Sequence, residues 1–207
     1  MIELFLSAFV SFFVVIDPPG CAPIFHGLTA GATPAHRRAM AIRAVIVATI
    51  ILIAFAFIGE PLLAVLGIDL DSFRIAGGIM LFFIAMEMVF EKRTQRREDR
   101  AEKVKGTAAV EDVSIFPMAM PMIAGPGSIA TVMLLMARAK GLEASFAVAG
   151  ALIANLLIML AALLAIGPLM RLLGQNVEAV MTRVLGVILA ALAVQFVIDG
   201  LRGSHLF

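Results

Sequence analysis

The stretch Asp17-Pro18-Pro19-Gly20 interrupts a long apolar run near the N-terminus. Residues 2–16 before it and residues 21–29 after it are almost wholly apolar. An acid, two prolines and a glycine break a helix, and inside hydrocarbon an ionisable side chain and unpaired backbone groups are costly. Such a break persists only where protein or a water-filled cavity surrounds it. We therefore expect the rest of the chain to enclose this break.

The composition is that of an integral membrane protein. Hydrophobic residues make up 62% of the 207 residues, and the mean hydropathy is +1.06, far above a soluble domain. The net charge of +1 and the absence of Trp and Tyr argue against a nucleic-acid partner. Cys21 is the single cysteine, so neither an intrachain disulfide nor a cysteine-based metal cluster can form. The expected partners are the lipid bilayer and a small-molecule substrate.

Six apolar segments are long enough to cross a bilayer, which takes about 20 helical residues. Four of them are predicted to be continuous spans, at residues 39–58, 72–90, 144–166 and 179–198. The first and fourth segments, residues 2–29 and 113–137, are each broken near the middle by Pro and Gly. The sequence thus predicts an all-α integral membrane fold, one transmembrane domain over residues 1–207, with helices 1 and 4 discontinuous at Pro/Gly motifs.

Two proline-containing connections lie between these spans. Glu60-Pro61 is expected to end the second span, with a short interfacial helix over residues 62–66. Gly167-Pro168 is expected to open a short amphipathic piece before the sixth span. Residues 91–112 are strongly hydrophilic and are expected to form a solvated loop.

The second half of the chain repeats the first. A shift of 107 positions (126 − 19) carries Pro19-Gly20 onto Pro126-Gly127 and Pro61 onto Pro168. Apolar sequences match easily by chance, but these matches are prolines and glycines in a common order. We therefore divide the domain into two related copies, residues 1–90 and residues 113–200.

Each copy contains three spans, so the two copies are expected to cross the membrane in opposite orientations. Inverted repeats whose first helices are discontinuous are typical of secondary transporters, with the substrate near the bilayer midplane. The connection at Arg37-Arg38 and the loop over residues 91–112 are basic, whereas the connection after the second span is acidic. The positive-inside rule then predicts both termini outside and the loop 91–112 in the cytoplasm.

Asp17 has two interpretations that the sequence leaves open. Asp is a favoured N-cap and Pro a favoured first helical residue, so Asp17 is expected to cap a half-helix beginning at Pro18. The N-terminus of that half-helix also suits an anionic ligand. Asp17 is then the candidate ion-coupling residue, able to receive a proton, Na⁺ or the ammonium group of a substrate.

The second break, Gly125-Pro126-Gly127-Ser128, has the same architecture without an acid. A plain kink is the alternative, but two breaks at equivalent repeat positions favour a site. Asn155 and Gln195 lie inside spans five and six, where they either hydrogen-bond neighbouring helices or line a central cavity. The candidate substrate-binding residues are Pro18, Gly20, Cys21, Gly125, Pro126, Gly127, Ser128, Asn155 and Gln195.

Signatures of catalysis are absent from the sequence. It has no Ser/His/Asp arrangement, no phosphate-binding glycine loop with lysine and no paired-histidine zinc motif. We therefore expect no enzyme, no catalytic residue, no metal site and no cofactor other than a coupling proton or Na⁺.

The two broken segments resemble the motifs of a known family. Residues 17–25, Asp-Pro-Pro-Gly-Cys-Ala-Pro-Ile-Phe, resemble the Asp-Pro-x-Gly-x-x-Pro-x-Phe motif of the MarC-related membrane proteins, also called the neutral amino acid transporter family. Residues 117–129 resemble the second family motif, and residues 74–78 and 195–200 resemble further family segments. The resemblance covers nearly the whole chain and implies a six-span inner-membrane protein of bacteria or archaea.

The resemblance also implies a substrate class, because transport of glycine or alanine is attributed to some members. Many members carry Asn where this chain has Cys21, which affects the expected specificity. We therefore expect a secondary transporter of small neutral amino acids with alternating access around a midplane site. Export of another small metabolite and a non-transporting membrane scaffold are the alternatives, and a homo-oligomer is left open.

Overall fold

The computed structural model describes residues 1–90 and 112–204, and within residues 166–179 it describes the backbone only. Every regular element in these residues is a helix. The elements are α1 (Ile2–Ile16), α2 (Pro18–Leu28), α3 (Pro34–Val65), α4 (Leu70–Val89), η1 (Ser114–Ile123), α6 (Pro126–Arg138), α7 (Leu142–Leu164) and α8 (Ile166–Gly203). The predicted all-helical class is confirmed for this part of the chain. Most of the predicted loop 91–112 lies outside the described residues.

The helices are long and apolar enough for a multi-pass membrane protein. Over the described residues, five elements meet the length and hydropathy of a membrane span when Ile2–Leu28 is counted as one. A sixth span arises if η1 and α6, which bend by 52° at their junction, are counted together. Large apolar side chains such as Phe57, Phe83 and Phe146 are more than 60% exposed on the outer faces, as expected where lipid surrounds the protein.

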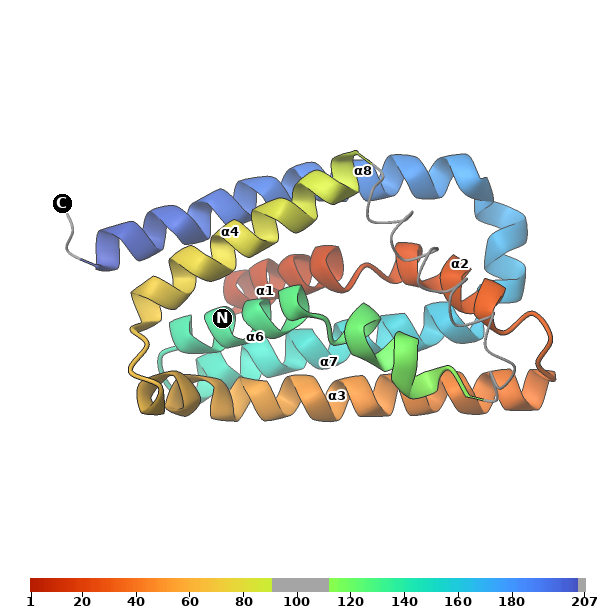
Figure 1. Ribbon diagram of the computed structural model, residues 1–207, viewed down its shortest axis with the longest axis horizontal. Coiled ribbons are helices and arrows are strands. Elements are labelled where there is room, and N and C mark those ends of the chain that lie inside the picture. Colours follow the sequence, from red (N-terminus) through yellow and green to blue (C-terminus); the bar gives the residue numbers. More distant parts are fainter. Residues whose placement is uncertain (91–111, 205–207) are drawn as a thin grey trace.

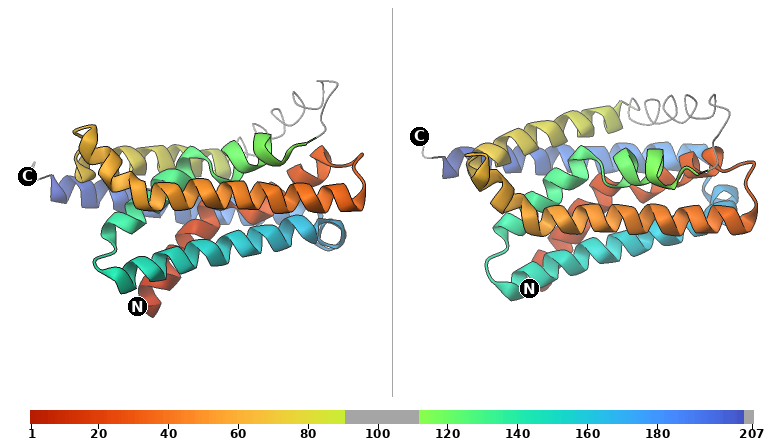
Figure 2. Two further views of the ribbon diagram at one scale, coloured as in Figure 1. Left: turned by 90° about the horizontal axis from the view of Figure 1, so that it is seen from below. Right: turned by 60° about the horizontal axis from the view of Figure 1, so that its bottom comes forward.

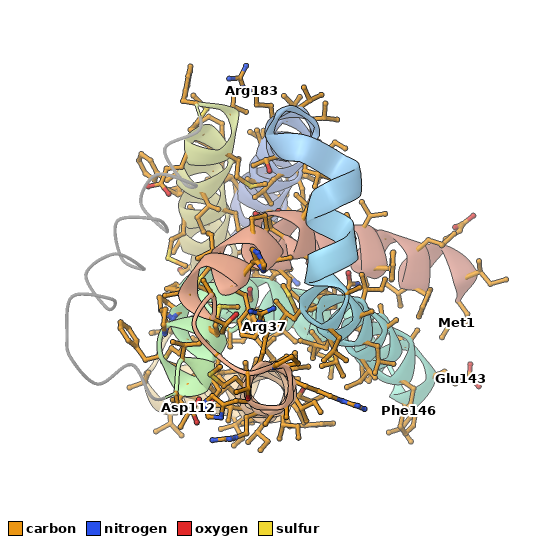
Figure 3. All side chains as sticks on the ribbon, turned by 90° about the vertical axis from the view of Figure 1, so that its right-hand side faces the viewer. Met1, Arg37, Asp112, Glu143, Phe146 and Arg183 are labelled. Carbon is orange, nitrogen blue, oxygen red and sulfur yellow. The ribbon has the colours of Figure 1, made fainter. Side chains whose placement is uncertain are left out.

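Three layers of helices make up the molecule (Figure 1). Helices α4 and α8 pack along each other on one side, and α3 packs with α7 on the other. The broken pairs α1–α2 and η1–α6 lie between these two layers and contact both of them. Figure 3 shows the same layering end-on, with Arg183 at the outer edge of the α4–α8 layer and Asp112 beside α3. The broken helices are therefore enclosed by protein on two sides.

A close approach of backbones joins α4 to α8. A Cβ atom at Gly78 would lie 2.7 Å from the carbonyl oxygen of Ala193 and 3.0 Å from the backbone nitrogen of Val197. Any larger residue at this position would push the two helices apart. Small residues that bring helix backbones together are the usual means of association inside a membrane.

The start of η1 is tied to α3 by Asp112. The Oδ1 of Asp112 accepts a hydrogen bond from the backbone N–H of Ser114 at 2.9 Å, and its Oδ2 pairs with Arg43. Burial of the carboxyl opposes ionisation, but the hydrogen bond from the backbone N–H of Ser114 and the charge of Arg43 lower the pKa of Asp112 below its usual value. A charged pair thus closes this end of the α3–η1 contact.

Two helix boundaries differ from the sequence prediction. Helix α3 continues through Pro61 to Val65, although Glu60-Pro61 was expected to end it. Only one turn follows Pro61, so few backbone hydrogen bonds are affected, and Figure 2 shows α3 changing direction near this end. Helix α8 begins at Ile166 and includes Pro168 in its first turn, where proline is tolerated because the N–H groups there have no intrahelical partner.

Candidate substrate site at two helix breaks

The first break is a single residue, Asp17, in the left-handed conformation. Its φ of 58° and ψ of 65° end α1 at Ile16 and start α2 at Pro18. The Oδ1 of Asp17 accepts a hydrogen bond from the backbone N–H of Gly20 at 3.1 Å, which confirms the capping interpretation. Asp is among the few residues other than glycine that adopt this backbone conformation readily. One side chain therefore turns the chain and caps the next helix.

Glycine at position 20 is required by the cap itself. A Cβ atom there would lie 2.3 Å from the Oδ2 of Asp17, inside van der Waals contact. Asp17 is only 1% exposed, and Gly20 and Cys21 are buried. The carboxyl group is thus enclosed between two half-helices, with Pro18 also buried beside it.

The second break lies at Ala124 and Gly125. Gly125 is extended, with φ −82° and ψ 172°, and α6 begins at Pro126 without a side-chain cap. The preceding half-helix η1 is irregular: it is wound as a π-helix and contains non-helical residues at Phe116 and Met120. Gly125, Gly127 and Ser128 are buried, whereas Pro126 is exposed.

The two breaks lie near each other at the middle of the molecule. Figure 1 shows both close to the midpoint of its long axis, with α1 and α2 on either side of one and η1 and α6 on either side of the other. A Cβ atom at Gly127 would lie 3.4 Å from the Cγ1 of Val15 and 2.7 Å from the Cδ1 of Ile84. The first turn of α6 therefore packs against the last turn of α1 and against α4.

Asn155 hydrogen-bonds to α1 at Phe9 and not to either break. It is completely buried, and its Nδ2 donates to the carbonyl oxygen of Phe9 at 3.0 Å and to that of Ala151 at 2.9 Å. Its Oδ1 is buried without a hydrogen-bond partner. Asn155 ties α7 to α1, which is the interhelical role weighed for it from the sequence.

Gln195 belongs to a different cluster, at the end of α6. It is exposed, and its Nε2 donates to the Oδ1 of Asp199 at 2.7 Å. Asp199 also pairs with Arg138, the last residue of α6, whose guanidinium lies 4.5 Å from the ring centre of Phe196. This ion pair was not predicted from the sequence. Its partners are 61 residues apart, and each alone is typical of a charged residue at the membrane interface.

An apolar groove also runs between α1 and α8. Its volume is about 360 Å³, and along α1 it extends from Leu6 to Val14, three residues before Asp17. Its polar lining comes from Ser7 and Ser11, and the Ser11 hydroxyl already donates to the carbonyl oxygen of Ser7 at 2.7 Å. This groove was not predicted from the sequence.

The two breaks offer different chemical groups. Asp17 offers a carboxyl group beside α2, and the uncapped N-terminus of α6 offers backbone N–H groups and a positive partial charge. Among the residues that the structure describes, no group of three His, Cys, Asp or Glu side chains has the spacing of a metal site.

The chain is similar to a family of membrane proteins over nearly its whole length. The family described as "MarC family integral membrane protein" matches residues 2–205. The UPF0056 membrane protein of Methanocaldococcus jannaschii is 36% identical over 205 residues, which cover 99% of both chains. YvbG of Bacillus subtilis is 35% identical over 98% of this chain and 96% of its own, and YhcE of Escherichia coli is 34% identical over 97% and 93%.

These relatives come from bacteria and archaea, and their names describe membrane proteins without a substrate. No solved structure matches the chain.

Proposed function

Because the chain belongs to the MarC family of integral membrane proteins, we propose that it is a secondary transporter of small neutral amino acids of the glycine and alanine class. The observation that carries the proposal is the pair of helix breaks near the middle of the molecule, one of which holds a buried carboxyl group. Discontinuous helices that meet at the midplane form the substrate sites of many transporters. A buried ionisable group in a span is costly and is retained for function.

The packing of the helices supports an inverted repeat. Under the 107-residue shift α1, α2, α3 and α4 correspond to η1, α6, α7 and α8. Helices α1 and α2 pack on α7, as η1 and α6 pack on α3, and α2 packs on α8, as α6 packs on α4. The contacts of α4 with α8 and of α3 with α7 join each helix to its own counterpart. A pseudo-two-fold axis in the membrane plane accounts for these contacts, whereas α1 packs on α8 more closely than η1 packs on α4.

The difference between the breaks suggests how a zwitterion is oriented. Asp17 already occupies the N-terminus of α2, so the carboxylate of the substrate is assigned to the N-terminus of α6, which has no side-chain cap. Asp17 then receives the substrate ammonium group, a coupling proton or Na⁺. Pro18, Gly20, Cys21, Gly125, Pro126, Gly127 and Ser128 surround the substrate in this proposal, with Asn155 supporting α1 from α7.

The layered fold supports alternating access. The α4–α8 layer is joined closely at Gly78 and is expected to rock as a unit against the α3–α7 layer, exposing the breaks to one side at a time. The basic loop 91–112 is assigned to the cytoplasm and both termini to the outside.

The proposal is tested first by ligand binding to the detergent-purified protein. A ligand that binds only the folded state stabilises it by about 2.7 kcal/mol at a hundredfold excess over its Kd. We expect glycine or alanine to raise the unfolding temperature in a panel that includes glutamate, lysine and small organic acids. A response to an organic acid alone would favour export of another metabolite, and silence across the panel would favour a membrane scaffold.

A further inference from the structure

Cys21 and Ser128 make the same contact at the two breaks. The Sγ of Cys21 donates to the carbonyl oxygen of Ile16 at 3.5 Å, and the Oγ of Ser128 donates to that of Ile123 at 2.7 Å. Each bond runs back five residues and crosses the break. The 107-residue shift that relates the halves carries Cys21 onto Ser128 and Ile16 onto Ile123. Both pairs are buried.

In a continuous helix, backbone N–H groups rather than side chains would donate to these carbonyl groups. In an unbroken helix the carbonyl of Ile16 would accept from the N–H of Gly20, four residues ahead. That N–H instead donates to the Oδ1 of Asp17, so the thiol of Cys21 takes its place. Each side chain therefore fastens the second half-helix to the end of the first.

The two hydrogen bonds differ in strength. A thiol is a weaker hydrogen-bond donor than a hydroxyl, so the Cys21 bond is the weaker of the two. A neutral hydrogen bond contributes on the order of 0.5–1.5 kcal/mol to a folded arrangement. Replacing one donor by the other therefore changes the free energy of the closed break by enough to alter how often it opens.

We infer that Cys21 and Ser128 are equivalent positioning residues that hold the two breaks closed, and that the weaker thiol makes the first break the one that opens. Opening releases the carbonyl oxygen of Ile16 beside the carboxyl group of Asp17. Two acceptors from consecutive residues are then available to an ammonium group. This last step rests on the proposed function; the opening itself does not.

Hydrogen–deuterium exchange of the detergent-purified protein tests the opening without any transport assay. Cys21→Ser should slow exchange over residues 16–22 by about three- to tenfold, and Ser128→Cys should speed exchange over residues 123–129 by a similar factor. The double variant, which swaps the two side chains, should show both changes together. Ser128→Thr keeps the hydroxyl and should exchange like the native protein.

The matched control is Ser11→Cys. Ser11 is buried, and its hydroxyl donates to the carbonyl oxygen of Ser7 within continuous α1, so the same chemical change does not involve a break. Exchange at both breaks should be unaltered in this variant. The inference is overturned if Cys21→Ser leaves residues 16–22 unchanged, or if Ser11→Cys and Ser128→Cys alter residues 123–129 equally.

Glycine uptake by the same variants separates the inference from the proposed function. When opening precedes binding, a more stable closed state lowers the apparent affinity. Cys21→Ser should therefore raise KM for glycine about three- to tenfold. A native protein that takes up neither glycine nor alanine would overturn the proposed function, while the exchange result would still decide the positioning role.

Discussion

The backbone N–H of Gly20 donates to the Oδ1 of Asp17 at 3.1 Å, so the acid at the first break is also the cap of α2. Capping and ion coupling are therefore not alternatives. The cap uses one hydrogen bond to the Oδ1 of Asp17, so it is compatible with the ion-coupling role that we propose for the same carboxyl group.

Asp17→Asn separates the two roles, because Asn is an equally good N-cap and adopts the left-handed conformation as readily as Asp. We expect the thermal unfolding temperature to stay within about 2 °C of the native value, which corresponds to less than about 1 kcal/mol. Asp17→Ala loses the cap and places alanine at a φ of 58°, so it should destabilise the protein by about 1–3 kcal/mol. Equal stability of the two variants would show that the cap contributes nothing.

Gly127 should tolerate alanine but not valine. The nearest atom to an added Cβ is the Cδ1 of Ile84, at 2.7 Å, and the end of a flexible side chain can move. A branched side chain would also meet Val15 and Leu81 and separate α6 from α1. Gly127→Val is expected to lower uptake of labelled glycine at least tenfold, whereas Gly31→Val, at a position with nothing within 4 Å of the added Cβ, should leave it unchanged. Normal uptake by Gly127→Val would remove this position from the site.

Alanine substitutions at Gly77 and Gly78 of α4 should differ in their effect on the stability of the protein. Alanine at Gly78 would push against the backbone of Ala193 and Val197, which cannot yield without moving α8. Alanine at Gly77 meets the Cδ1 of Leu134 at 3.0 Å, and that side-chain end can shift. Thermal unfolding should show a loss of about 1–3 kcal/mol for Gly78→Ala and a smaller loss for Gly77→Ala. The reverse order would contradict the close α4–α8 contact.

Arg138 and Asp199 join the end of α6 to α8, and each side chain is 30% exposed. A double-mutant cycle with Arg138→Met and Asp199→Asn should give a coupling free energy of about 1 kcal/mol in thermal unfolding, decreasing as salt is added. Strict additivity of the two substitutions would mean that the pair does not hold α6. Gln195→Leu is the control, since it removes only the hydrogen bond to Asp199.

The all-helical class was predictable from the apolar composition, and the prolines inside the apolar runs indicated that helices begin at Pro18 and Pro126. Asp17 as a cap followed from the residue type and the proline after it. Its left-handed backbone did not, since the residue before a proline is usually extended.

The remaining features depend on contacts between distant parts of the chain. The irregular winding of η1, with non-helical residues at Phe116 and Met120, has no periodic signal in an apolar segment. Gln195 was considered for a central cavity because it lies in a span, yet its amide turns outward to Asp199. Helix α8 runs as one helix from Ile166, because a proline in the first turn of a helix does not interrupt it.

Uptake by proteoliposomes tests the central claim most directly. The native protein and Asp17→Asn are reconstituted, and entry of labelled glycine is followed under an imposed proton gradient, an imposed Na⁺ gradient or neither. The account predicts that one gradient drives accumulation by the native protein and that Asp17→Asn loses this dependence. Accumulation by Asp17→Asn with the same ion dependence as the native protein would contradict it.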